Sequence, residues 1–191
     1  MKMNLNLYMV VPSTESLGPG KRFVIWVQGC NKRCKGCIAA DAWDTTGGIN
    51  TDVGDLAEQI IEQKNIEGIT ISGGEPFLQQ QPLVELVHQI RRMNDLGVII
   101  YTGMKYEEIK DTELAQCADL IIDGEYVEDL NDNKSLRGSS NQNVICLTDR
   151  YKSIAAKYFG QPGRKIELII SDDETRIVGI PSRSLSEMIG D

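Results

Sequence analysis

Short apolar runs alternate with helix-like segments along most of this chain, and this alternation restricts its fold more than any other feature. The strand-like runs are 22–28, 68–72, 97–101, 119–123 and 143–147, and the helical patterns between them are 52–64, 81–95 and 105–116. Such runs separated by helices are typical of parallel β/α units, in which helices cover the sheet. The sequence therefore predicts an α/β fold whose functional residues lie at the carboxyl ends of the strands.

The rest of the chain fits one domain spanning residues 1–191. Its 191 residues are 41% hydrophobic, enough for a single core. Near the C-terminus, the strand-like runs 165–170 and 175–180 flank Ser171-Asp172-Asp173-Glu174, which predicts a hairpin. The polar segment 128–143 is predicted to be a long loop.

Three cysteines crowd the segment that follows the first strand-like run. Cys30, Cys34 and Cys37 have the spacing C-x3-C-x2-C. Three thiolates on one loop can bind an inorganic centre and leave it one coordination position short, which is where substrate or cofactor chemistry occurs. A structural zinc ion would need a fourth protein ligand. The candidates for that ligand are poorly placed, because two read as packing residues and one as solvent-facing: Cys117, Cys146 and His88.

Glycine and polar residues follow the later strand-like runs. They are Gly73, Gly74 and Glu75, then Thr102 and Gly103, then Asp123, and finally Arg137, Asn141 and Gln142 in the polar segment. Some of these residues also have an ordinary structural explanation. A Gly-Gly pair can form a strand-to-helix turn, an acid is favourable at a helix N-terminus, and an Asp–Arg pair can hold a long loop.

Taken in this order, the motifs resemble those of the radical S-adenosylmethionine (radical SAM) superfamily, and most of all the small activating enzymes of anaerobic ribonucleotide reductase. The resemblance covers about residues 20–180. It implies an incomplete (β/α) barrel with parallel strands and a C-terminal hairpin. It also implies two cofactors, which are a [4Fe–4S] cluster on Cys30, Cys34 and Cys37 and S-adenosyl-L-methionine (SAM) on the cluster's open iron.

The resemblance further implies roles for the other motif residues. Gly73, Gly74 and Glu75 would receive the SAM amino group, Thr102 its ribose or methionine region, and Arg137 its carboxylate, while Asp123 would be a polar site residue. Asn141 and Gln142 would bind SAM or line a substrate groove. In this family the reduced cluster cleaves SAM to a 5′-deoxyadenosyl radical, which abstracts a hydrogen atom from the substrate.

The cysteine loop departs from the activating-enzyme pattern C-x-H-x-C-x-G-C-Y-N. Lys32 stands at the His position, and Ile38-Ala39 replaces Tyr-Asn. Three functions therefore stay open. The chain abstracts hydrogen from a glycine of a glycyl radical enzyme such as anaerobic ribonucleotide reductase, it modifies a peptide or small molecule directly, or it is a non-catalytic Fe–S or zinc module. Either enzyme would need a low-potential electron donor such as a flavodoxin or ferredoxin.

Charge and composition limit the partners. A net charge of −8 disfavours nucleic acid, and no apolar run approaches the roughly 18 residues of a membrane span. Clustered cysteines and the lack of a secretory pattern predict a cytoplasmic protein. Basic residues gather near the cysteine loop, which predicts either solvated loop residues or a docking patch for an acidic electron donor or an anionic substrate. They are Lys21, Arg22, Lys32, Arg33 and Lys35.

Overall fold

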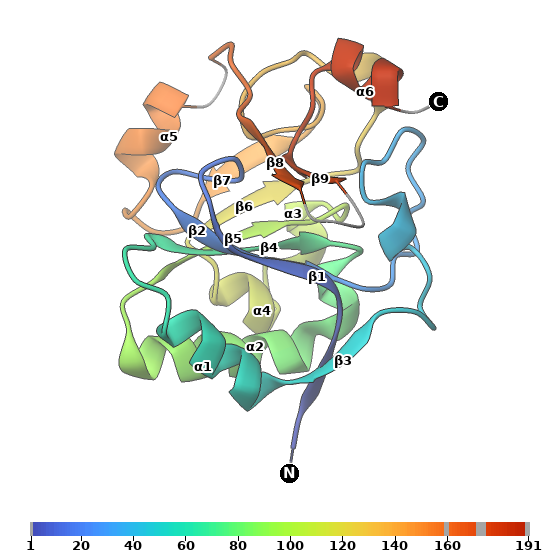
Figure 1. The fold of residues 1–191 in the computed structure, drawn as a ribbon. Helices are drawn as coiled ribbons and strands as arrows, with labels where there is room; N and C mark the ends of the chain where they lie inside the picture. The colour runs from blue at the N-terminus through green and yellow to red at the C-terminus, as the bar shows by residue number, and fades with distance from the viewer. Residues whose placement is uncertain (1, 159–160, 171–174, 190–191) are drawn as a thin grey trace.

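A computed structural model describes residues 2–158, 161–170 and 175–189. Its centre is a seven-stranded sheet of order β3-β1-β2-β4-β5-β6-β7 (Figure 1). The strands are β1 (Asn4–Thr14), β2 (Arg22–Val27), β3 (Ile49–Asp52), β4 (Gly68–Gly73), β5 (Gly97–Tyr101), β6 (Leu120–Asp123) and β7 (Asn143–Cys146). Strands β2, β4, β5 and β6 are mutually parallel, whereas β1 pairs antiparallel with β2 and β3, and β7 with β6. The predicted α/β fold with a parallel central sheet is confirmed at this level.

Helices cover one face of the sheet. Helices α1 (Val53–Ile61), α2 (Gln80–Met93) and α4 (Glu113–Gln116) lie on the same side of it (Figure 1). Their apolar side chains pack with those of the strands into the largest core cluster. Every residue of β2 is buried, as expected for a strand that is covered on both faces.

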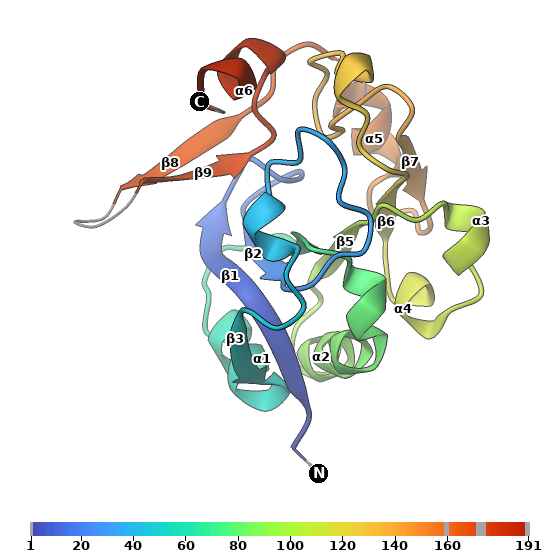
Figure 2. The same cartoon turned by 90° about the vertical axis from the view of Figure 1, so that its right-hand side faces the viewer.

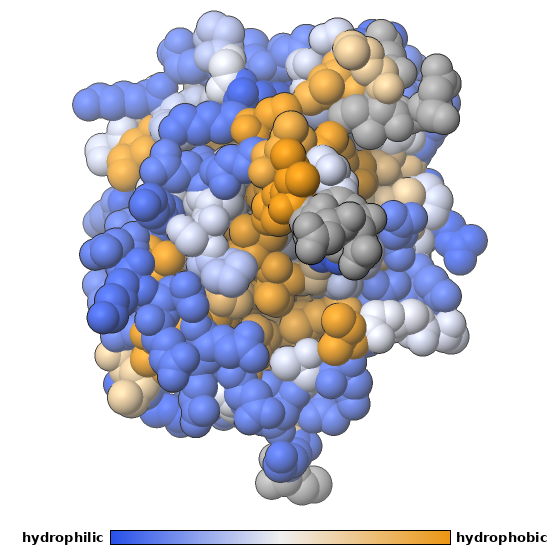
Figure 3. Space-filling view, viewed as in Figure 1, coloured by the Kyte–Doolittle hydropathy of each residue, from blue (hydrophilic) through white to orange (hydrophobic). Residues whose placement is uncertain are grey.

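The C-terminal part of the chain lies over the other face. Strands β8 (Ile166–Ile170) and β9 (Thr175–Gly179) form the predicted antiparallel hairpin, whose predicted turn at 171–174 lies outside the described residues. Val178 of β9 packs in a second core cluster with Trp26, while the rest of the hairpin extends away from the body of the protein (Figure 2). Side chains of β8 form an apolar strip at the surface (Figure 3), namely Ile166, Leu168, Ile169 and Ile170.

Several elements differ from the predictions. The segment 105–116 was predicted as one helix but forms two, α3 (Tyr106–Ile109) and α4, because the Thr112 hydroxyl accepts a hydrogen bond from Ala115 N and starts a new helix. Strands β1 and β3 were not predicted, nor were helices α5 (Lys152–Tyr158) and α6 (Arg183–Ile189). Short 3-10 turns interrupt three loops, at Ala40–Ala42, Pro76–Gln79 and Glu128–Leu130. Within the described ranges, no helix has both the length and the apolar character of a membrane span.

A buried arginine closes the end of the sheet where the parallel strands begin. Arg22 is fully buried, and its Nε donates to Thr70 Oγ1 at 2.7 Å. Its four other N–H groups point at four acceptors, which are the Tyr151 hydroxyl and the carbonyls of Pro19, Ile69 and Gly97. Glycines make room for this network, because a Cβ on Gly97 would lie 1.9 Å from the Tyr151 hydroxyl oxygen. The guanidinium is thus fully hydrogen-bonded without a carboxylate partner.

Candidate metal and cofactor site

The three predicted cysteines lie together on the loop between β2 and β3, at the opposite end of the sheet. All three thiols are free and half-buried. The loop is tightly turned, because Arg33 and Gly36 both have positive φ. Cys30 N donates to Trp43 O at 3.1 Å, and Cys37 N donates to Cys34 O at 3.2 Å. Backbone hydrogen bonds therefore hold both ends of the cysteine motif.

The electrostatics of the loop suit a cationic centre. Burial raises the pKa of the Cys34 and Cys37 thiols, and the neighbouring cysteines raise both further. Metal ligation requires thiolates, so a bound iron centre would supply the positive charge that these buried groups lack.

The glycine pair joins the end of β4 to the cysteine loop. Gly74 N donates to Val27 O at 2.7 Å, and Glu75 N donates to Gly29 O at 2.8 Å. A Cβ on Gly74 would lie 2.1 Å from Gly29 O, and one on Gly73 would lie 2.4 Å from Val27 N. The glycines were predicted to let a ligand approach, but the close approach that the structure shows is to the protein's own backbone.

Glu75 is a buried carboxylate held by donors from two strand ends. Its side chain accepts hydrogen bonds from Thr102 Oγ1 at 2.7 Å, Gly103 N at 2.9 Å and Phe77 N at 3.1 Å. Burial raises its pKa even though these three hydrogen bonds and Lys32 oppose the rise. A carboxylate has about four acceptor positions, so Glu75 retains capacity for one more donor.

These groups line one cavity of about 170 Å³. The three thiols, Glu75 and the backbone of 73–74 and 102–103 form its polar end. The rest of its wall comes from the face of the sheet opposite the helices and from the base of the hairpin, and includes Leu17, Trp26, Tyr101, Ile180 and Pro181. The structure therefore places seven of the predicted site residues on one wall, and their roles as ligands stay predictions: Cys30, Cys34, Cys37, Gly73, Gly74, Glu75 and Thr102.

Two other predicted site residues lie away from this wall. Asp123 is buried, but its carboxylate accepts from Tyr106 N at 2.7 Å and from both nitrogens of Asn143, so it anchors α3 and β7. Arg137 donates to Asp132. Neither side chain lines the cavity, and each has its own partner rather than the other. A cofactor role for Asp123 and Arg137 stays a prediction.

Two residues of the polar segment 128–143 differ in their position relative to the cavity. Gln142 lines the cavity, where its amide accepts from Gly138 N and donates to Gly124 O, both at 2.8 Å. Asn141 instead donates to Glu125 O. Gln142 thus shapes the backbone of the wall.

None of the three residues considered as a fourth zinc ligand, Cys117, Cys146 and His88, lies on the cavity wall. Cys117 is buried in the main core with its Sγ 3.8 Å from His88 Nε2, and Cys146 packs against a separate cluster. In the part of the chain that the structure describes, no three His, Cys, Asp or Glu side chains are arranged to hold a single metal ion. An iron–sulfur cluster binds each thiolate through a different iron, so its ligands do not converge on one point.

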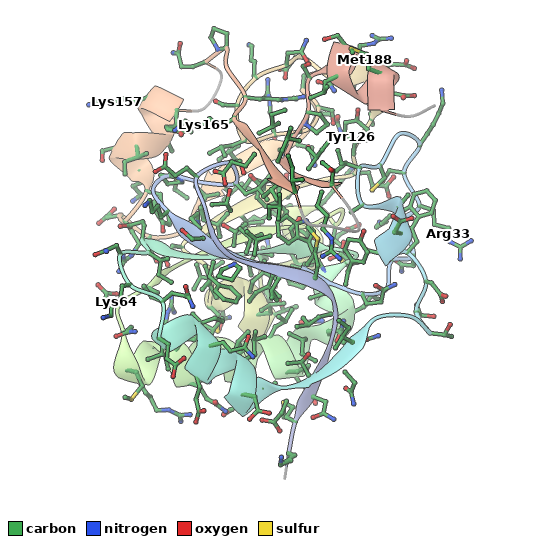
Figure 4. The ribbon with its side chains drawn as sticks, in the orientation of Figure 1. Arg33, Lys64, Tyr126, Lys157, Lys165 and Met188 are labelled. Atoms are coloured by element: carbon green, nitrogen blue, oxygen red, sulfur yellow. The ribbon has the colours of Figure 1, made fainter. Side chains whose placement is uncertain are left out.

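The basic residues near the cysteine motif do not form one patch. Lys21 and Arg22 lie at the start of β2, at the opposite end of that strand. Lys32 Nζ lies 3.0 Å from Glu125, and Lys35 Nζ lies 3.0 Å from Glu128. Arg33 projects outward from the loop (Figure 4). The predicted docking patch is therefore wrong as a continuous surface.

Several residues of the wall were not predicted as site residues, among them Lys32 and Tyr101. Lys32 lines the cavity, and Tyr101 lines it with a buried hydroxyl that has no hydrogen-bond partner among the described residues. The signal for Tyr101 was strand alternation: it lies on the face opposite to Ile100, whose side chain packs in the helix-covered core.

Three thiols on one loop, next to a carboxylate and an open cavity, define a protein of the iron–sulfur class. Residues 16–145 match the family described as 4Fe-4S single cluster domain, and the chain belongs to that family. It is 34% identical over 152 residues to the anaerobic ribonucleoside-triphosphate reductase-activating protein of Enterobacteria phage T4, which covers 76% of this chain and 96% of that protein. It is 33% identical to the protein of the same name from Escherichia coli (strain K12), over 73% of this chain and 97% of that protein.

The chain is also similar to a more distant relative, which activates a different enzyme. The chain is 28% identical over 156 residues to the pyruvate formate-lyase 1-activating enzyme of Escherichia coli (strain K12), covering 78% of this chain and 60% of that enzyme. The predicted resemblance to the radical SAM activating enzymes is confirmed. Its cofactors are a [4Fe–4S] cluster and SAM, and the donor set fits both, since three thiols leave one iron open and Glu75 has room for an ammonium group.

Proposed function

We propose that this chain activates a glycyl radical enzyme by abstracting a hydrogen atom from a glycine Cα, with an anaerobic ribonucleotide reductase as the partner. The observation that carries this proposal is the hydrogen-bonded junction between the cysteine loop and Glu75, which puts three thiols and a carboxylate on one cavity wall. The names of the relatives, which are activating proteins of such reductases, support the partner.

When bound, the cluster would provide one-electron transfer and SAM the organic radical that the reaction needs. The chain's own residues would bind and orient these groups. Cys30, Cys34 and Cys37 would hold three irons, and Glu75 would accept the SAM ammonium. Thr102 is a positioning residue, because its hydroxyl donates to Glu75 and accepts from Met104 N at 3.0 Å. The apolar part of the wall would exclude water from the radical.

The arrangement of the helices on the sheet supports a more specific assignment of the fold. We assign the sheet to the incomplete (β/α) barrel of the radical SAM type, in a single domain. In a barrel all helices lie on the outer face of the strands, and α1, α2 and α4 share one face here (Figure 1). The opposite face carries the cavity.

A low-potential flavodoxin or ferredoxin would supply the electron.

Formation of 5′-deoxyadenosine tests the chemistry, and electron paramagnetic resonance tests the partner. The anaerobically reconstituted, dithionite-reduced protein should produce 5′-deoxyadenosine from SAM, and Cys34→Ala should produce none. Cys146→Ala is the matched control, since Cys146 lies outside the cavity wall, and it should remain active. Added anaerobic ribonucleotide reductase should gain a glycyl radical signal. Cleavage by Cys34→Ala, or cleavage without any glycyl radical in the reductase, would contradict the proposal.

A further inference from the structure

The cavity wall carries one acidic and one basic side chain. Among the described residues that line it, Glu75 is the only carboxylate and Lys32 the only cation. The methionine end of SAM also carries one charge of each sign, an ammonium and a carboxylate. A buried or half-buried charge needs a partner of opposite sign, so the two residues match the two charges of this group.

Lys32 and Glu75 meet at Gly103. The Gly103 N–H donates to Glu75 Oε2 at 2.9 Å. A Cβ on Gly103 would lie 3.1 Å from Lys32 Cγ and 3.5 Å from Glu75 Oε2. The stem of Lys32 therefore runs over the residue that holds Glu75, and the absent side chain of Gly103 leaves space between the cation and the anion.

The ammonium of Lys32 lies at the edge of this space. Its side chain is 27% exposed, and Nζ lies 3.0 Å from Glu125, whose side chain is 54% exposed. An ion pair with a half-exposed carboxylate contributes little to stability. Lys32 can therefore exchange Glu125 for a ligand carboxylate at small cost, because Glu125 is left in contact with solvent.

The arginine predicted to bind the SAM carboxylate does not compete for this role. Arg137 pairs with Asp132 and does not line the cavity. Besides the open iron of the cluster, Lys32 is then the one cationic group of the described wall that the SAM carboxylate could contact.

We propose that Lys32 binds the carboxylate of SAM while Glu75 binds its ammonium. The inference rests on the proposed function only in taking SAM as the ligand of this cavity, and it assigns to Lys32 the contact that sequence reasoning gave to Arg137.

The test crosses two ligands with three proteins. SAM and decarboxylated SAM are titrated calorimetrically into the oxidised, cluster-loaded protein, which binds SAM without cleaving it. Lys32→Met should lower the affinity for SAM by about 10- to 100-fold, the range for a charge-assisted contact, and leave decarboxylated SAM within about twofold of wild type. Lys35→Met is the matched control: Lys35 forms the same kind of ion pair with Glu128 but lies outside the wall, and it should change neither affinity.

A further variant removes the ion-pair partner of Lys32 instead of Lys32 itself. Glu125→Gln removes the competing partner of Lys32, so SAM affinity should rise by about two- to fivefold. Equal losses for SAM and decarboxylated SAM in Lys32→Met, or no loss for either, would overturn the inference. Because binding requires no glycyl radical partner, failure to activate a reductase would leave the Lys32 result standing, whereas a wild type that binds no SAM would overturn both proposals.

Discussion

Both ends of the parallel strands bury charged side chains, and Arg22 at one end differs from Glu75 at the other in how its hydrogen bonds are satisfied. Where the strands begin, all five N–H groups of Arg22 are hydrogen-bonded within the protein. Where they end, Glu75 accepts three hydrogen bonds and faces a cavity. Figure 4 shows the two ends on opposite sides of the molecule, Lys64 near the first and Arg33 near the second.

The difference follows from the groups for which the neighbouring glycines leave space. At the closed end, Gly68 and Gly97 make room for protein groups, since a Cβ on Gly68 would lie 2.7 Å from an Arg22 nitrogen. At the open end, Gly73 and Gly74 bring two backbone segments together and leave the carboxylate beside a cavity. A buried charge whose hydrogen bonds are complete is structural, and one with remaining capacity can take a ligand.

The largest effect is expected at the closed end. Arg22→Met removes every donor of the network and leaves buried acceptors without partners, so it should lower the free energy of unfolding by about 3–5 kcal/mol. Urea unfolding of the cluster-free protein measures this. The neighbouring Lys21 is exposed, and Lys21→Met should change stability by less than about 0.5 kcal/mol. Similar losses in the two variants would show that Arg22 is not the structural charge described here.

At the open end, a charge-removing substitution should affect binding more than stability. Glu75→Gln removes the negative charge and keeps the shape, so SAM affinity should fall by at least about tenfold while iron content stays unchanged. Calorimetric titration and iron analysis measure the two quantities. Glu85→Gln on α2 is the control, because Glu85 lies 3.5 Å from Arg92 on the helix-covered side and outside the cavity wall. Unchanged SAM affinity in Glu75→Gln would remove Glu75 from the ligand site.

The hydroxyl groups of two tyrosines show the same difference between the two ends. The Tyr151 hydroxyl accepts from Arg22 at 2.9 Å, whereas the buried Tyr101 hydroxyl has no partner among the described residues. Tyr151→Phe leaves a buried donor unpaired and should cost about 1–3 kcal/mol. Tyr101→Phe removes an unpaired group and should be neutral or slightly stabilising. Equal losses in urea unfolding would mean that the Tyr101 hydroxyl has a partner in solution.

The sequence was informative where spacing itself determines chemistry. The interval between Cys30, Cys34 and Cys37 places three thiols on one loop whatever the surrounding fold. The strand-end rule likewise placed Glu75 and Thr102 correctly, because parallel strands end at one edge. The central strands of the sheet were predictable because their burial makes them continuously apolar.

Other features depend on contacts between distant residues. Arg137 and Asp123 are polar and near strand ends, but their partners Asp132 and Asn143 could only be found in the folded chain. Arg22 looked like part of a surface patch, and only its contact with Tyr151, 129 residues away, shows it to be structural. Lys32 was noticed as a departure from a pattern, whereas its place on the wall follows from the packing of Gly103.

The pH dependence should also separate the two ends, with a smaller effect than the substitutions at Arg22 and Glu75. Burial raises the pKa of Glu75 in the folded state above its ordinary value of 4.5. As pH rises past 4.5 the unfolded chain ionises first, so the contribution of Glu75 to stability is lost up to the folded-state pKa. SAM affinity should rise over the same window, because the ammonium prefers the ionised carboxylate. Urea unfolding and SAM titration from pH 4 to 7, each compared with Glu75→Gln, measure the two opposite slopes. Stability of wild type that rises with pH relative to Glu75→Gln would reverse the sign and show that hydrogen bonds, rather than burial, dominate at Glu75.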